Sequence, residues 1–99
     1  MVAQLLEPIP RTFAELPLIR PWQSLRQHLT WLEGAEETWF ACKDGVCWLH
    51  FEYGFHTFQV CEHGTRVELS VTDAACPERI LNEVTQHFAA LLSPHDRPC

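Results

Sequence analysis

The spacing of apolar residues changes along the chain and divides it into a helix, a sheet and a second helix. Between residues 22 and 32 and again between residues 77 and 93, apolar positions recur every three or four residues, as in amphipathic helices. Pro21 suits the start of the first helix, and Gly34 marks its end. The two apolar stripes comprise Trp22, Leu25, Leu29 and Leu32, and then Ile80, Leu81, Val84, Phe88, Leu91 and Leu92.

Between the helices, apolar and polar residues alternate, and three dipeptides ending in glycine predict tight hairpin turns. These are Asp44-Gly45, Tyr53-Gly54 and His63-Gly64. Tyrosine disfavours the positive φ that such a turn requires, so a wider loop or a bulge is an alternative at Tyr53. Counting outward from each turn makes one face apolar in all four strands, through the pairs Cys42–Cys47, Phe40–Leu49, Thr38–Phe51, Leu49–Phe58, Cys47–Val60, Val60–Val67, Phe58–Leu69 and His56–Val71.

These patterns predict an α+β fold, a four-stranded antiparallel meander with an N-terminal and a C-terminal helix packed on its apolar face. A chain of 99 residues is sufficient for one hydrophobic core, so residues 1–99 are expected to form a single domain. Residues 1–20 are predicted to form a proline-interrupted arm, in which Thr12 and Glu15 have the spacing of a helix capping box, and residues 94–99 a loose tail. The first strand, 36–43, and the fourth, 65–72, should be free edges.

The charge balance argues against nucleic acid and membrane surfaces as partners. Seven Lys and Arg against 13 Asp and Glu give a net charge of −6, which repels phosphate groups. No apolar stretch approaches the roughly 20 residues that span a bilayer. The first residues also lack the features of a secretory signal, so the chain is expected to be cytoplasmic.

Five cysteines without paired CxxC spacing predict reduced thiols rather than a disulfide framework. Cys42 and Cys47 nevertheless face each other across the first predicted hairpin, close enough for a redox pair. The favoured interpretation is that both are small core residues. His50, Glu52 and Cys61 share the polar face, but His50 and Cys61 should lie about 13 Å apart, so no metal site is predicted.

Trp39, Trp48 and His50 lie together in the middle of the predicted polar face and are the candidate binding residues. Tryptophan is enriched where a partner buries it, although a cross-strand aromatic pair that stabilises the sheet, or an arm folded over it, would also explain the pattern. No catalytic motif is present, and neither catalytic residues nor a cofactor are predicted.

The preferred hypothesis is therefore a non-catalytic protein-interaction or self-association module that binds a protein partner or forms a homodimer. The alternative is a metal- or redox-responsive regulator that uses Cys42, Cys47 and Cys61. An enzyme with a cleft between the arm and the helices is a third hypothesis.

Overall fold

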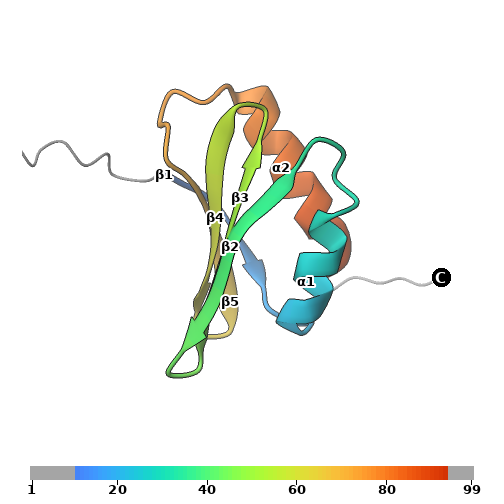
Figure 1. Ribbon diagram of the computed structural model, residues 1–99, viewed down its shortest axis with the longest axis vertical. Helices are drawn as coiled ribbons and strands as arrows, with labels where there is room; N and C mark the ends of the chain where they lie inside the picture. Colours follow the sequence, from blue (N-terminus) through green and yellow to red (C-terminus); the bar gives the residue numbers. More distant parts are fainter. Residues whose placement is uncertain (1–10, 94–99) are drawn as a thin grey trace, which may run out of the picture.

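The computed structural model describes residues 11–93, which form an antiparallel sheet with two helices on one face (Figure 1). The predicted α+β class is confirmed, but the sheet has five strands rather than four. β2 to β5 form the expected meander, and β1 lies beside β5 in the order β1-β5-β4-β3-β2. Along the chain the elements are β1 (Arg11–Pro17), α1 (Trp22–Leu29), β2 (Glu36–Lys43), β3 (Val46–Tyr53), β4 (His56–His63), β5 (Arg66–Val71) and α2 (Glu78–Leu92).

The additional strand, β1, comes from the segment predicted to be an arm. Ala14 pairs with Leu69 and packs against the core, while Thr12 and Glu15 pair with Ser70 and Glu68. This alternation is interrupted at Phe13 by a bulge, which obscures the period of two in the sequence. The predicted capping box is therefore wrong, and so is the free edge at 65–72, because β1 covers it. The remaining predictions for the arm before residue 11 and for the tail at 94–99 lie outside the described residues.

The register of the sheet follows the prediction in the first hairpin and differs from it in the other two. Cys42 pairs with Cys47 and Phe40 with Leu49, although a bulge at Thr38 places Glu37 opposite Phe51. In the other hairpins each pairing is displaced by two residues. The observed pairs are Leu49–Val60 and Phe51–Phe58 between β3 and β4, and Val60–Leu69, Phe58–Val71 and Glu62–Val67 between β4 and β5. Because the displacement is even, the side chains of β3, β4 and β5 keep their predicted faces, whereas the bulge in β2 places Glu37 on the face where Thr38 was predicted.

The displacement arises because glycine occupies the first central position of each of these turns, not the second. Gly54 and Phe55 both have positive φ, 62° and 69°, as in a type I′ turn. Tyr53 consequently stays in β3, and its hydroxyl donates a hydrogen bond of 2.8 Å to Glu83 on α2. A Cβ on Gly54 would lie 3.1 Å from Ile80, so glycine also permits the close approach of α2. The bond to α2 and this contact together account for the position of the turn.

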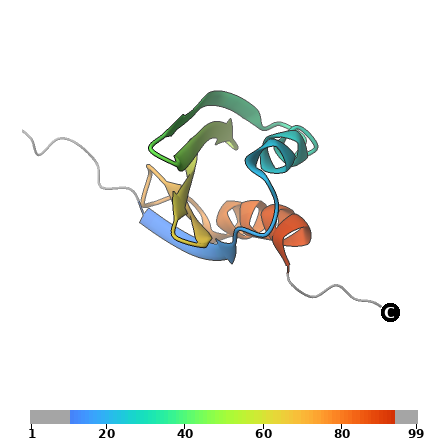
Figure 2. The same cartoon turned by 90° about the horizontal axis from the view of Figure 1, so that it is seen from below.

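The hydrophobic core lies between the concave face of the sheet and the helices, and Figure 2 shows the sheet curving around both. α1 ends at Leu29, earlier than predicted, and the chain continues in tight turns to Gly34. α2 agrees with its prediction to within one residue. The fully buried core residues are Leu25, Leu29, Leu49, Phe51, Phe58, Val60, Val67, Leu69, Val71, Leu81, Val84, Phe88 and Leu92.

Two histidines join α1 to α2. Nε2 of His28 lies 2.7 Å from the carbonyl oxygen of His87, and Nε2 of His87 lies 2.7 Å from that of His28. Since a carbonyl only accepts, both Nε2 atoms carry the proton. The two rings stack with centroids 4.0 Å apart. Burial lowers the pKa of His87 below its ordinary 6.5, an effect that the His28 carbonyl offsets in part and the His28 ring reinforces.

Candidate interaction site

The predicted tryptophan face lies on the side of the sheet that the helices leave uncovered (Figures 1 and 2). Trp39 pairs with His50 and Ala41 with Trp48 between β2 and β3, as the first hairpin predicts. Residues 39 and 41, like 48 and 50, are two positions apart and therefore share a face. The structure thus brings Trp39, Trp48 and His50 together. β1 lies at the other end of the sheet, so the described part of the arm does not cover them.

A shallow hollow of about 420 Å³ is centred on these side chains. The ring of Trp39 lies against the ring of His50, with centroids 4.9 Å apart and planes inclined by 59°. Nε2 of His50 lies 2.8 Å from Oε1 of Gln59, which holds the imidazole in place. Trp39 remains 49% exposed, an unusual state for a large aromatic residue in a sheet. The lining residues are Trp39, Ala41, Lys43, Trp48, His50 and Gln59.

Charges lie at both ends of this hollow. Lys43 borders one end, and Glu36 and Glu52 face each other across β2 and β3 beyond the other. Opposed like charges on a sheet are destabilising. None of these three side chains has an ion-pair partner within residues 11–93. A ligand can therefore contact the aromatic side chains of this hollow and an unpaired charge at each end.

β2 is also an open edge of the sheet, as predicted for residues 36–43. It pairs only with β3, so half of its backbone N–H and C=O groups face away from the sheet. A second hollow, of about 370 Å³, borders this edge on the side of the helices. Its lining residues are Gln23, Arg26, Gln27, Thr30 and Glu37.

Arg26 organises this second hollow. Its guanidinium group donates two hydrogen bonds to the Glu37 carboxylate, at 3.1 and 2.8 Å, and its Cζ lies 4.3 Å from the ring centroid of Phe40. The hydrogen bond to Glu37 is the main cause of a raised Arg26 pKa. One face of β2 therefore borders an aromatic hollow and the other a polar one.

Cys42 and Cys47 form a disulfide, so the expectation of reduced thiols is wrong for this pair. Their pairing is as predicted, but the helices do not cover this end of the hairpin. Cys42 is exposed and Cys47 half-buried, whereas the favoured interpretation required two core residues. The alternation of apolar and polar residues indicates the face of the sheet on which a side chain lies, but not how far that side chain is from the helices. The exposure of Cys42 could therefore not be predicted.

Cys61 is separate from the disulfide and lies opposite Trp48 on β4. Burial, reinforced by Glu68 and Glu62, raises the pKa of its thiol and disfavours the reactive thiolate. The structure does not bring His50, Glu52 and Cys61 together as ligands. In residues 11–93 no group of three His, Cys, Asp or Glu side chains is placed to hold a metal ion.

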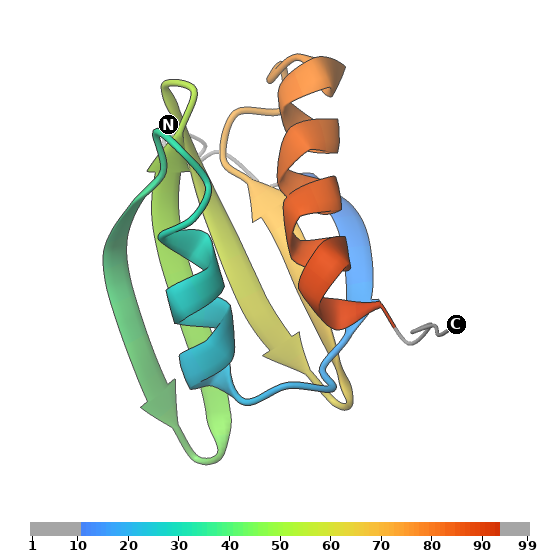
Figure 3. The same cartoon turned by 90° about the vertical axis from the view of Figure 1, so that its right-hand side faces the viewer.

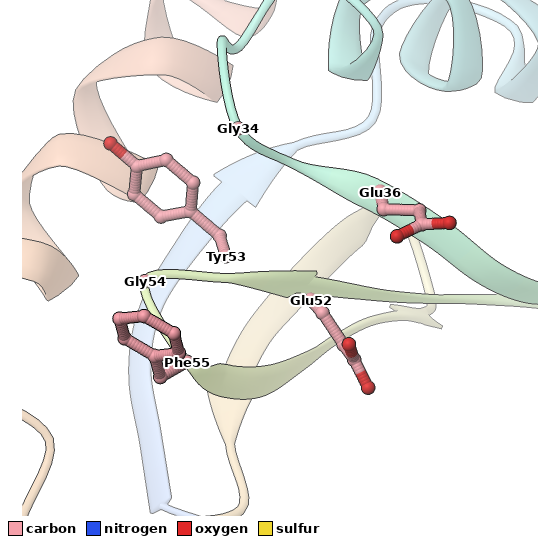
Figure 4. Close-up of a pocket in the computed structure, with 6 residues that line it drawn as sticks. All are labelled: Gly34, Glu36, Glu52, Tyr53, Gly54 and Phe55. Carbon is pink, nitrogen blue, oxygen red and sulfur yellow. The ribbon is translucent and has the colours of Figure 1, made fainter.

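A third hollow, which sequence reasoning missed, lies where the β3–β4 turn approaches the start of β2 (Figure 4). Its volume is about 260 Å³. Phe55 lies at the tip of the turn, fully exposed and in a left-handed conformation that is rare for a bulky residue. The sequence prediction placed Tyr53 in the turn and Phe55 in the following strand, so it did not identify Phe55 as an exposed turn residue. The lining residues are Gly34, Glu36, Glu52, Tyr53, Gly54 and Phe55.

Comparison with protein-family models, with curated proteins and with solved structures gives no match. The helices between residues 11 and 93 are too short or too polar to cross a membrane.

Proposed function

We propose that this chain is a non-catalytic protein-interaction module that accepts an extended strand of another chain along β2. The observation that carries the proposal is the open β2 edge with a hollow on each side. A strand added to a sheet edge gains main-chain hydrogen bonds, and its alternating side chains enter pockets on opposite faces. Here they would meet Trp39 and Trp48 on the outer face and Arg26 and Gln27 on the other.

The two faces define the ligand. Aromatic or aliphatic side chains suit the tryptophan hollow, and polar side chains suit the hollow beside α1. The unpaired carboxylates of Glu36 and Glu52 favour a basic residue at their end of β2, and Lys43 favours an acidic residue at the other end. The expected ligand is an extended peptide that alternates apolar and polar residues and carries a basic residue at one end and an acidic residue at the other.

The test is a selection from a displayed library of random 12-residue peptides, followed by calorimetry on the selected sequences. Trp39→Ala and Trp48→Ala should each weaken binding at least about tenfold, as expected for residues at the centre of an interface. Trp31→Ala is the matched control, because Trp31 is 67% exposed but lies just after α1. Peptides that bind both tryptophan variants as tightly as the wild type would refute the proposal.

A redox-responsive regulator is the second candidate, favoured by the disulfide between Cys42 and Cys47. Stable disulfides are uncommon in reducing compartments, so a chain that works there would use this bond as a switch. Reduction by two glutathione molecules would add two electrons and two protons, free both thiols and release oxidised glutathione. Cys61 is not part of this candidate, since its thiol lies apart from the bond and its raised pKa disfavours reaction.

Equilibration in glutathione buffers of graded composition, followed by alkylation and mass spectrometry, tests the switch. The fraction of disulfide should change across the range of buffers found in reducing and oxidising compartments. A bond that stays closed throughout that range is a static crosslink and removes this candidate.

A further inference from the structure

The two ends of β2 carry opposite charges on the same face of the sheet. Glu36 begins the strand and pairs with Glu52, whereas Lys43 ends it beside the tryptophan hollow. Lys43 is the only lysine in the chain. When two identical strands pair in antiparallel fashion, the start of one lies beside the end of the other. Both unpaired charges could then be neutralised by a second copy.

The bulge at Thr38 places the two ends of β2 at equal distances from one central residue of the strand. With Thr38 as the extra residue, the ladder positions of β2 run Glu36, Glu37, Trp39, Phe40, Ala41, Cys42 and Lys43. Phe40 is the midpoint of this series. A two-fold axis through Phe40 therefore pairs each of these seven positions in one copy with one of the seven positions in the other.

We propose that two copies of this chain associate through β2 about this axis and form one continuous ten-stranded sheet. Lys43 of each copy lies opposite Glu36 of the other, and Trp39 lies opposite Ala41. The inference rests on the proposed function and deepens it, because it names the added strand as β2 of a second copy.

The small side chain of Ala41 fits this arrangement. Ala41 lies between Trp39 and Lys43 on β2, opposite Trp48, and forms part of the floor of the hollow of about 420 Å³. Trp39 of the second copy would enter the hollow above Ala41 and beside Trp48. Trp39 is 49% exposed, so about half of the roughly 150–250 Å² that a tryptophan can bury is still accessible, and the pairing covers it in both copies. Trp39 of the second copy would then fill the hollow.

The helices do not obstruct the pairing. Figure 3 shows α1 set back from the outer edge of β2, and the hollow lined by Gln23, Gln27 and Thr30 lies between them. Phe40 is held from within the molecule by Arg26 and by Trp22, whose ring centroid lies 5.9 Å away. The inner face of β2 therefore needs no rearrangement before a second strand approaches.

A short edge buries less surface than a standard interface, and two chains of net charge −6 repel each other. The expected dissociation constant is accordingly weak, on the order of 10–100 μM. The local charge pairs should then decide whether the dimer forms. Charge exchange is a sharper test than salt, because salt screens both the local attraction and the overall repulsion.

The experiment is sedimentation equilibrium of the full chain from 10 to 500 μM, a range chosen to bracket that estimate. The wild type should show a reversible monomer–dimer equilibrium. Lys43→Glu and Glu36→Lys each place like charges opposite each other at two positions and should weaken the dimer at least about tenfold. Mixing these two variants should restore association as a heterodimer, and the double variant should restore the homodimer.

Arg20→Glu is the matched control for net charge, since it changes the charge by the same amount as Lys43→Glu at an exposed position before α1. It should leave association unchanged. Equal weakening by Arg20→Glu, failure of the mixture to associate, or a wild type that stays monomeric would overturn the inference. A dimer that persists in denaturant without reductant is covalently linked through free cysteines and counts equally against it.

The outcomes separate the inference from the proposed function. A monomeric wild type that still binds selected peptides through Trp39 and Trp48 overturns only the self-pairing. A dimer restored by charge exchange, together with peptide binding that ignores both tryptophans, supports the pairing and refutes binding of peptides along β2. Circular dichroism of every variant verifies that its fold is intact.

Discussion

The two outer strands of the sheet leave their edges in different states. Both strands contain a bulge, but β1 has seven residues and ends at Pro17, which cannot donate a backbone hydrogen bond. Arg11 at its start forms an ion pair with Glu78 on α2, with a separation of 2.6 Å. β2 has eight residues and no proline, and hollows border both of its faces. Natural proteins use proline, among other devices, to protect sheet edges against pairing with other chains, and of these two strands only β1 contains one.

This difference suggests a division of roles between the edges. β1 pairs with β5, and its side chains close one end of the core. Phe13 is an example, because its ring lies edge-on to that of Phe58 on β4, with centroids 5.9 Å apart. The largest side chain of β2 on the outer face, Trp39, is instead half-exposed. Substitutions in β1 should therefore affect folding, and substitutions on the outer face of β2 should affect binding.

The largest effect on stability is expected in β1. Phe13→Ala removes an aromatic contact with the core and should lower the free energy of unfolding by about 2 kcal/mol, less than for a fully buried phenylalanine. Urea denaturation measures the change, with Thr12→Ala at an exposed neighbouring position as control. A change under about 0.5 kcal/mol, typical of surface positions, would show that β1 is not part of the cooperative fold.

An intermediate effect is expected at Arg26, which connects α1 to the inner face of β2. Arg26→Met should lower the free energy of unfolding by about 1 kcal/mol, since a bidentate pair and a cation–π contact are lost at a partly exposed site. A double-mutant cycle with Glu37→Gln isolates the ion pair, for which we expect about 0.5 kcal/mol. A coupling energy of zero would limit the role of Arg26 to packing on Phe40.

A smaller effect is expected from pH, which acts on the helices rather than on either edge. The pKa of His87 is lowered in the folded state, so below its ordinary value of 6.5 the unfolded chain binds the proton more readily. The contribution of His87 to stability is therefore complete above pH 6.5 and is lost as the pH falls through the lowered value.

Urea denaturation between pH 7.5 and 5 measures this dependence. It should be shallower in His87→Gln than in the wild type and unchanged in His63→Gln, which alters an exposed histidine on β4. The same slope in all three proteins would contradict the assignment to His87.

The smallest effect on stability is expected at Trp39. Trp39→Ala removes one exposed cross-strand contact with His50, and we expect a loss of about 0.5 kcal/mol in the free energy of unfolding. The same substitution should weaken strand binding at least about tenfold. A loss of 2 kcal/mol or more, the range of large-to-small core substitutions, would make Trp39 a structural residue and remove the contrast between the edges.

The periodicity of the sequence determined the two helices, the side of each central strand that faces the core, the free edge at 36–43 and the shared face of Trp39, Trp48 and His50. These features depend on local spacing, and the spacing of a strand is unchanged when the strand slides by two residues. That is why the predicted faces of β3 to β5 were correct even though two of the three registers were not, whereas in β2 the bulge at Thr38 changed the face of Glu37.

Only the tertiary structure decided the features that depend on contacts between distant segments. The position of the second turn follows from the contacts of Tyr53 and Gly54 with α2, and β1 became a strand because β5 offered an unpaired edge. The exposure of Cys42 likewise depends on how far the helices extend over the sheet. Local spacing contains no information on these distances, since each is set by how residues far apart in the chain pack together.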